Sequence, residues 1–411
     1  MRVDTTILLL CAAGIAHQVR AGELVSLGVL PGASSMLAVD ISADGSVVVG
    51  NAIAAGGAPQ AFRWTRATGP LPIVTGTPGW PTVYACNHDG SVAVGEVGNR
   101  AFRWSAGSGT LMLGVLTDYE PDHGAIHNLS TSTCVSASGD LVAGMSSDTG
   151  TSVARPFVWS ASSGRMSWAG VSLEGSSSSE THQVSDMSAD GTVLVGYNPA
   201  LGAFRASGGT AQLLVRPGGE PGWAAPARAF AVSDDGAVVV GTSGDRAFRW
   251  TAATKMVDLG HLPGASSTVA YATNGDGRVV TGTSGGRAFL WTRAAGMVDL
   301  MGHLTDAGFD VSGWLLEVAH AVSADGTAIA GWGFFGGQHR AFIVTGVPMP
   351  TPPCGSSDLF PDGLVNGADL GILVSQWGPA TEATASDINR DGVVNGADLG
   401  MLLSNWGPCA D

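Results

Sequence analysis

Residues 387–398 carry oxygen-bearing side chains at the spacing of a calcium-binding loop. Loop positions 1, 3, 5, 9 and 12 are occupied by Asp387, Asn389, Asp391, Asn395 and Asp398. The glycine at position 6 permits a sharp turn, and the backbone carbonyl of Val393 at position 7 would add a further oxygen. Calcium takes about six to eight oxygen ligands, so this spacing predicts a calcium site, although Asp398 stands where a longer glutamate is usual.

The same pattern occurs a second time, upstream. Its candidate ligands are Asp358, Asp362, the carbonyl of Leu364, Asn366 and Asp369. Phe360 stands at position 3, where an oxygen ligand belongs, so we expect this loop to bind calcium more weakly. The simpler alternative for both loops is a solvated acidic turn. Apolar residues at helical spacing follow each loop, namely Leu370, Leu373, Val374 and Trp377, then Leu399, Leu402, Leu403 and Trp406.

The duplicated loop–helix unit, with aspartate at position 12 and no entering helix, resembles a type I dockerin. The resemblance implies calcium binding and a tether to a cohesin-like or other surface receptor, often beside polysaccharide-degrading enzymes. Dockerins read cohesins partly through loop positions 10, 11, 17 and 18, and here these are Gly367, Ala368, Val374 and Ser375, then Gly396, Ala397, Leu403 and Ser404. A conventional cohesin partner is therefore not implied. The two WGP ends and the flanking cysteines are similar to the GC-type variant of surface-anchored proteins.

Two pairs of cysteines have different expected states. Cys354 and Cys409 bracket the dockerin-like unit, whose pseudo-twofold symmetry should bring its ends together, so a disulfide is expected in an exported protein. Cys86 and Cys134 lie near the same strand position of neighbouring repeats, and we expect buried thiols there.

The composition limits the function classes. The 411 residues include 19 Lys and Arg against 34 Asp and Glu, a formal net charge of −15. This balance argues against nucleic acid and against anionic membrane surfaces as partners. Only 13% of residues are charged and 61 are glycine, which favours turn-dense β structure over helix.

The N-terminus has the pattern of a secretory signal peptide. Arg2 precedes an apolar run over residues 7–16 that is too short to span a bilayer, and small residues precede a cut after Ala21. We therefore expect a secreted or cell-surface protein with residues 1–21 removed and with no transmembrane segment.

Seven repeats at a spacing of roughly 40–50 residues fill the middle of the chain. Each begins with a small-residue segment that ends in a turn, at Asp44-Gly45, Asp89-Gly90, Ser138-Gly139, Asp190-Gly191, Asp235-Gly236, Asp276-Gly277 and Asp325-Gly326. A VVVG-type strand, an AFRW-type strand and an MVDLG-type strand follow. Four-stranded units at this spacing predict an all-β, seven-bladed β-propeller, with Phe and Trp of AFRW packed between blades.

The two ends of the repeat region predict how the ring closes. The seventh repeat lacks its fourth strand, and residues 24–27 form a fourth strand without a blade. The N-terminal strand can therefore complete the last blade, whereas an open solenoid would need polar caps. The expected domains are a propeller over 22–346, a Pro-rich linker over 347–353 and the dockerin-like unit over 354–411. The repeats resemble the extracellular HAF repeat of exported bacterial proteins, which implies location and architecture but no chemistry.

Candidate functional residues lie on one rim of the predicted ring. Glu120, Asp122 and His123 could serve acid–base chemistry or bind a metal, although a solvated acidic loop is the simpler interpretation. Aromatic residues expected on this rim could stack on sugars or fill gaps between blades, namely Trp80, Trp223, Trp314 and Trp332. No nucleophile elbow, phosphate loop, zinc spacing or dinucleotide motif occurs, so no catalytic residue is assigned.

Two functional hypotheses follow. The leading one is a secreted, non-catalytic propeller that binds or displays a ligand, with polysaccharide on its rim, and is tethered by the calcium-dependent unit. The alternative is a dockerin-bearing carbohydrate-active enzyme, a polysaccharide hydrolase or lyase.

Overall fold

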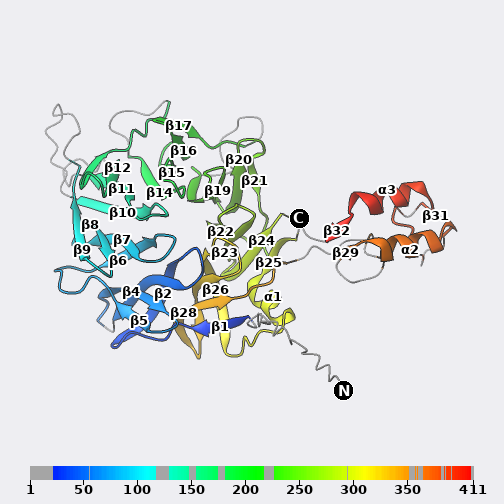
Figure 1. The fold of residues 1–411 in the computed structure, drawn as a ribbon, viewed down its shortest axis with the longest axis horizontal. Helices are drawn as coiled ribbons and strands as arrows, with labels where there is room; N and C mark the ends of the chain where they lie inside the picture. Colours follow the sequence, from blue (N-terminus) through cyan, green and yellow to red (C-terminus); the bar gives the residue numbers. More distant parts are fainter. Residues whose placement is uncertain are drawn as a thin grey trace, which may run out of the picture.

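The computed structural model describes residues 22–54, 56–116, 129–147, 154–174, 181–216, 226–293, 295–350, 364–380, 386–389 and 391–408, together with 357, 359 and 384. Seven four-stranded antiparallel sheets form a ring (Figure 1). The space at its centre, called the channel, is lined mainly by residues of the first strands of the blades and the turns that follow them. The predicted seven-bladed propeller is confirmed. Blade 1 consists of β2(Ala33–Ile41), β3(Val47–Ala54), β4(Pro59–Thr65) and β5(Gly69–Pro72). Blade 2 consists of β6(Thr82–Cys86), β7(Val92–Val97), β8(Arg100–Ser105) and β9(Gly109–Gly114). Blade 3 consists of β10(Leu129–Val135), β11(Leu141–Ser147), β12(Ala154–Ser160) and β13(Arg165–Trp168).

The remaining blades repeat this order, with the first strand of each nearest the channel. Blade 4 consists of β14(Gln183–Met187), β15(Val193–Asn198), β16(Gly202–Ser207) and β17(Thr210–Leu213), and blade 5 of β18(Arg228–Val232), β19(Val238–Ser243), β20(Arg246–Thr251) and β21(Lys255–Asp258). Blade 6 consists of β22(Thr268–Thr273), β23(Val279–Ser284), β24(Arg287–Thr292) and β25(Gly296–Asp299). Blade 7 consists of β26(Trp314–Val322), β27(Ile329–Phe335), β28(Gln338–Thr345) and β1(Glu23–Ser26).

The N-terminal strand closes the ring, as predicted. β1 pairs antiparallel with β28, with Glu23 opposite Thr345 and Ser26 opposite Phe342. Blade 7 therefore contains both ends of the repeat region. Pairing the two ends in one sheet removes an exposed edge that could otherwise recruit another strand.

A closed circle of seven backbone hydrogen bonds surrounds the channel. The residue just before each turn donates its N–H to the carbonyl of the equivalent residue in the next blade, at 2.8–3.3 Å. The circle begins with Ala43 N to His88 O and ends with Ala324 N to Ala43 O. Small residues at most of these positions allow the inner strands to approach one another closely, as the Ala- and Ser-rich first strands predict.

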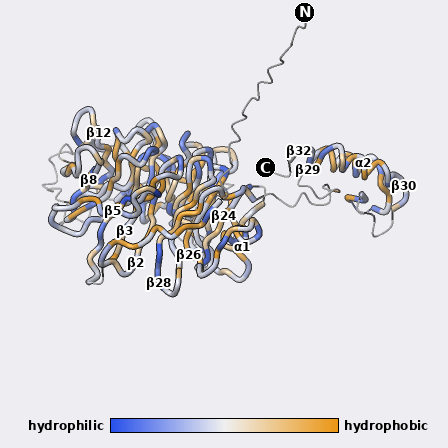
Figure 2. Tube along the Cα trace, turned by 60° about the horizontal axis from the view of Figure 1, so that its bottom comes forward, coloured by the Kyte–Doolittle hydropathy of each residue, from blue (hydrophilic) through white to orange (hydrophobic). Residues whose placement is uncertain are grey.

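The AFRW motif joins adjacent blades. Its phenylalanine is fully buried in all seven repeats, at Phe62, Phe102, Phe157, Phe204, Phe248, Phe289 and Phe342. Its arginine has a role that the sequence did not indicate: Arg63 Nε donates to the carbonyl of Gly90 in the next blade, at 2.8 Å. Figure 2 shows hydrophobic colouring along β24 and β26, between more polar turns.

Two helical regions complete the described structure. α1(Leu300–Asp306) directly follows β25, where the sequence predicted only a strand, and Asp299 caps its first turn. The C-terminal unit contains α2(Gly367–Ser375), α3(Gly396–Ser404) and two short ladders that pair β29(Leu364–Val365) with β32(Gly407–Pro408) and β30(Gly378–Pro379) with β31(Val393–Val394). Among the described residues, no helix has the length and hydrophobicity needed to cross a membrane.

The predicted apolar stripes of the C-terminal helices are only partly buried. Leu373 and Leu402 are fully buried between the helices, with Val365, Ile388 and Val394. Four other residues of the stripes are about half exposed, namely Val374, Trp377, Leu403 and Trp406. The two tryptophans lie beyond the helices, which end at Ser375 and Ser404. Two short helices packed on each other cover only one face of each, so the rest of each stripe is left accessible.

Candidate functional site

Two aspartates break the repeat on the inner strands. Asp40 of β2 and Asp186 of β14 each stand four residues before the aspartate that opens the turn of their repeat, next to a β-bulge. The other five blades have small residues at this position: Ala85, Cys134, Ala231, Ala272 and Ala321. The pair was not predicted from the sequence, and the signal that could have found it is the departure from a small residue at one register position.

Each aspartate bridges its own blade to the next. Asp40 accepts hydrogen bonds from the N–H of Ile41 at 2.8 Å and from the N–H of Cys86 in blade 2 at 2.7 Å. Asp186 makes the equivalent pair of bonds in blades 4 and 5, from Met187 at 2.8 Å and Val232 at 2.9 Å. These bonds fix both carboxyl groups at the channel wall and leave each oxygen with further capacity to accept a hydrogen bond.

Burial gives both carboxyl groups an unusual affinity for protons. It raises the pKa of Asp40 to about 6, although the two backbone N–H groups favour the charged form. It raises the pKa of Asp186 to about 7, and the nearby charge of Asp40 contributes to this shift. Both groups therefore exchange protons close to neutral pH, which an acid–base pair requires.

Asp40 and Asp186 line a hollow of about 410 Å³ in the channel. One wall is aromatic: Tyr271 stacks on His320 with 4.9 Å between ring centroids, and Phe230 lies 5.8 Å from Tyr271. Trp332 supports His320, at 5.1 Å between ring centroids. Tyr84 and Gln183 also line the hollow and add polar groups to it.

His320 is held in one orientation at this wall. Its Nδ1 lies 2.8 Å from the carbonyl oxygen of Val39, so Nδ1 carries the proton and donates it. Burial lowers the pKa of His320, and the hydrogen bond to Val39 only partly offsets this effect. The imidazole is therefore neutral, and its ring packs against those of Tyr271 and Trp332.

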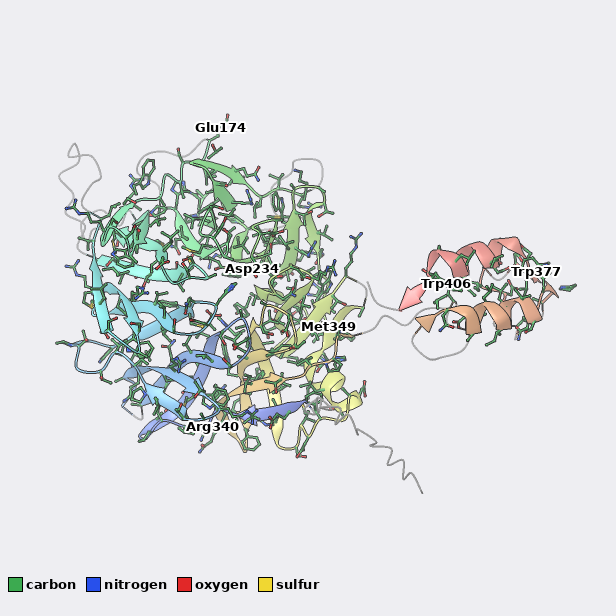
Figure 3. All side chains as sticks on the ribbon, viewed as in Figure 1. Glu174, Asp234, Arg340, Met349, Trp377 and Trp406 are labelled. Atoms are coloured by element: carbon green, nitrogen blue, oxygen red, sulfur yellow. The ribbon has the colours of Figure 1, made fainter. Side chains whose placement is uncertain are left out.

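The channel is crossed at a second level. His88 of blade 2 and Asp234 of blade 5 occupy the same repeat position, and His88 Nε2 lies 3.2 Å from Asp234 Oδ1. The hydrogen bond to Asp234 raises the pKa of His88, against the opposing effect of burial. Figure 3 places Asp234 near the centre of the ring. A Cβ on Gly275 would meet Asp234 Oδ2 at 2.5 Å, so glycine makes room for this carboxylate.

The residues predicted on the rim lie in different environments. Trp80 is exposed, with 69% of its surface accessible, and Trp332 lies against His320. Trp314 takes the packing alternative rather than sugar stacking: it is only 5% exposed, and its ring centroid lies 4.7 Å from that of Phe335 and 5.8 Å, edge-on, from that of Phe342. Four further candidates lie outside the described residues, namely Glu120, Asp122, His123 and Trp223.

The second calcium loop is described except for its position 4. Asp398 is fully buried and turns toward the backbone, where it accepts from the N–H of Ile388 at 2.8 Å, Asn389 at 3.1 Å and Asn395 at 2.9 Å. Burial raises the pKa of Asp398, but these three bonds together hold it below its usual value. Asp387 likewise accepts from the N–H groups of residues 391 and 392.

Parts of the first loop and the predicted disulfide lie outside the described residues, namely Asp358, Asp362, Cys354 and Cys409. In the first loop, Asp369 accepts from the N–H of Asn366 at 2.8 Å, as its counterpart Asp398 does in the second. Cys86 and Cys134 are buried free thiols, as predicted, and burial raises the pKa of both well above its usual value.

Comparison with known proteins addresses the propeller. No protein-family model and no curated protein matches the sequence. Among solved structures, an oligogalacturonate lyase in complex with manganese is 11% identical, with a TM-score of 0.53 over 79% of this chain and 93% of that one. The propeller is similar to that of oligogalacturonate lyases. An oligogalacturonate lyase from Vibrio parahaemolyticus is 10% identical, with a TM-score of 0.52 over 79% of this chain and 94% of that one.

This likeness shows the fold alone, but it corrects the leading functional prediction. A propeller that only binds or displays a ligand was expected, whereas these two solved structures that share the fold are both lyases. One of them is a manganese complex, but the described part of this chain has no group of three or more His, Cys, Asp or Glu side chains that could hold a metal ion.

Proposed function

We propose that this protein is a carbohydrate-active enzyme that cleaves a glycosidic bond in the hollow lined by Asp40 and Asp186. The observation that carries the proposal is this pair of carboxyl groups, which share one hollow and have pKa values near neutrality. The fold likeness to lyases supports an enzyme, and the aromatic wall supports a sugar as substrate.

Hydrolysis fits the pair of carboxyl groups. Asp186, with the higher pKa, is the proton donor to the glycosidic oxygen, and Asp40 is the base that takes a proton from water. The bond between the anomeric carbon and the glycosidic oxygen breaks with its electron pair on that oxygen, and the hydroxyl of water forms the new bond to the anomeric carbon. Tyr271, His320 and Phe230 line the same hollow, so their aromatic surface would contact the sugar beside the two carboxyl groups.

Elimination on a uronate is the second candidate, favoured by the lyases that share the fold. It requires a base to remove the proton next to the uronate carboxylate, and a positive group to stabilise the charge that develops there. No arginine or lysine is among the described residues that line the hollow, which instead contains two aspartates. The charge of the hollow therefore favours a neutral sugar and hydrolysis.

The experiment is product release from a panel of cellulose, xylan, mannan, laminarin and polygalacturonate by the full-length mature protein. New reducing ends report any cleavage, and ultraviolet absorbance of an unsaturated product reports elimination. We expect reducing ends without unsaturated product, released at least about a hundredfold more slowly by Asp40→Asn and Asp186→Asn. Asp190→Asn is the matched control, because Asp190 lies in an exposed turn and bonds only within that turn.

Three outcomes contradict the proposal or its reaction. No product from any polysaccharide would contradict an enzyme of this class. Undiminished activity in both channel variants would show that the reaction occurs elsewhere. Unsaturated product that depends on Asp40 and Asp186 would replace hydrolysis by elimination. Thermal melts of each variant separate loss of chemistry from loss of the fold.

We propose as well that the C-terminal unit binds calcium, mainly through the second loop, and attaches the exported protein to a surface receptor. The oxygen spacing of Asp387, Asn389 and Asp391 supports the first part, and the dockerin resemblance supports the second. Calorimetric titration of the full-length protein with calcium tests it, with Asp387→Ala expected to remove the tighter site. The boundaries of the signal peptide and linker, and a disulfide between Cys354 and Cys409, belong to the same proposal and are testable by mass spectrometry of the secreted protein.

A further inference from the structure

A second hollow lies on the outer surface between blades 1 and 2. It has a volume of about 370 Å³, and Trp80, Thr82, Glu96 and Asn99 are among the residues that line it. Trp80 is the most exposed of the large apolar side chains in the described part of the chain, at 69%. A tryptophan that is so exposed, beside polar groups in a concave surface, is typical of a binding site rather than of a packing position.

The loop that carries Trp80 is fixed by a contact between two backbones. Gly79 has φ +115°, and a Cβ at this position would lie 2.7 Å from the N and 2.9 Å from the Cα of Gly98 in the turn between β7 and β8. Glycine is thus required at position 79 both by its conformation and by the space available. The turn is itself in the left-handed region, at Gly98 (φ +57°) and Asn99 (φ +62°). Trp80 is therefore presented to solvent by backbone that is already ordered.

A short hydrogen-bonded path connects this surface to the channel hollow. Glu96, which lines the outer hollow, accepts from the Tyr84 hydroxyl at 3.2 Å and from Thr131 Oγ1 at 2.5 Å. Tyr84 lines the channel hollow that contains Asp40 and Asp186. Burial, together with the charge of Glu96, raises the pKa of Tyr84 to about 12, so the phenol keeps its proton and donates it to Glu96. One hydrogen bond thus links a residue that lines the outer hollow to a residue that lines the channel hollow.

We propose that the hollow beside Trp80 is an outlying sugar subsite, which binds a unit of the same polysaccharide chain whose scissile bond lies in the channel hollow. The indole face would stack on the C–H face of a pyranose ring, and Glu96 and Asn99 would bind its hydroxyl groups. This inference rests on the proposed function for the identity of the ligand as a saccharide. It adds that the enzyme holds a chain over several units, so that longer substrates bind more tightly than short ones.

The test compares a long and a short ligand of the same sugar. Calorimetric titrations with cellohexaose, xylohexaose and mannohexaose, and with the matching disaccharides, are made on the full-length protein. We expect Trp80→Ala to weaken binding of a hexasaccharide by about tenfold, the scale of one aromatic stacking contact, and to change disaccharide affinity by less than about twofold. Trp80→Phe should restore most of the loss. Gly79→Ala should weaken hexasaccharide binding to a similar extent, because it displaces the loop that holds Trp80.

Trp168→Ala is the matched control, because Trp168 is also partly exposed but lies on the outer strand of blade 3. Equal hexasaccharide affinity in Trp80→Ala and the wild type would contradict the subsite. It would also be contradicted if Trp80→Ala weakened the binding of hexasaccharide and disaccharide equally. Absence of binding to every probe would contradict it too. If Trp80 supports hexasaccharide binding but the wild type cleaves no polysaccharide, the subsite stands and the proposed enzyme falls. If polysaccharide is cleaved but hexasaccharide binding does not depend on Trp80, the enzyme stands and the subsite falls.

Discussion

Asp234 and His88 join two blades that are not neighbours in the ring: Asp234 Oδ1 lies 3.2 Å from His88 Nε2, across 146 residues of sequence. The two residues lie just after the inner strands of blades 2 and 5, so the pair crosses the channel. Both side chains are 42% exposed, so the interaction stabilises the fold only modestly, by less than about 1 kcal/mol. The raised pKa of His88 nevertheless determines how this stabilisation changes with pH.

The His88–Asp234 pair should stabilise the protein most at low pH. A histidine whose pKa is raised in the folded state contributes its full stabilisation below its unfolded pKa, and this is lost as the pH rises through the folded value. Asp234→Asn should therefore lower the melting temperature more at about pH 5 than at about pH 8. Measurement of the His88 titration by NMR in both proteins should show a lower pKa in the variant. An unchanged His88 titration would contradict the pairing.

Closure of the ring should depend on Gly45. This residue has φ +71°, and a Cβ there would lie 2.6 Å from the Cβ of Ala328 in blade 7. Gly45→Ala combines backbone strain of about 1–2 kcal/mol with a clash that costs about 1–3 kcal/mol more. Gly69→Ala is the matched control, since Gly69 has φ +65° and no atom within 4 Å of the added Cβ. Urea unfolding should show a clearly larger loss of stability for Gly45→Ala, and equal losses would contradict close packing of blade 1 on blade 7.

Arginine in the AFRW motif should stabilise the propeller by joining blades. Arg103 Nε donates to the carbonyl of Gly139 in the next blade at 3.0 Å, as Arg63 does to Gly90 at 2.8 Å. Arg103→Met keeps most of the side-chain volume but removes the donor, so we expect a loss of about 1–3 kcal/mol. Arg66→Met is a suitable control, because Arg66 pairs at the surface, with Glu23. Equal unfolding midpoints for Arg103→Met and the wild type would show that this bond does not hold the blades together.

The fold was readable from the sequence because each repeat carries its own turn, inner strand and core phenylalanine. Phe62 and its six equivalents are fully buried, as the repeated motif predicted. The single strand at the start of the repeat region, β1, pairs with β28, as its lack of a blade of its own predicted. The helix α1 was missed because its residues continue a strand motif shared with other repeats. The sequence could not decide between packing and sugar stacking for Trp314, because its burial depends on the neighbouring Phe335 and Phe342, which no local pattern reveals.

The channel site was less readable because its members come from distant repeats. Asp40 lies in blade 1 and Asp186 in blade 4, and only the ring brings their charges close enough to influence each other. Each also looks like an ordinary strand residue within its own repeat. Alignment of the seven repeats could have found them, since symmetry predicts a small residue at both positions.

The pH dependence of kcat/KM on whichever polysaccharide is cleaved is the sharpest test of the acid–base pair. With Asp40 as the base at a pKa of about 6 and Asp186 as the acid at about 7, we predict a bell-shaped profile with its maximum between these values. Asp186→Asn should leave only weak activity without the falling alkaline limb. A profile that is flat from about pH 5 to about pH 8, or an alkaline limb that persists in Asp186→Asn, would show that these two carboxyl groups are not the acid and the base.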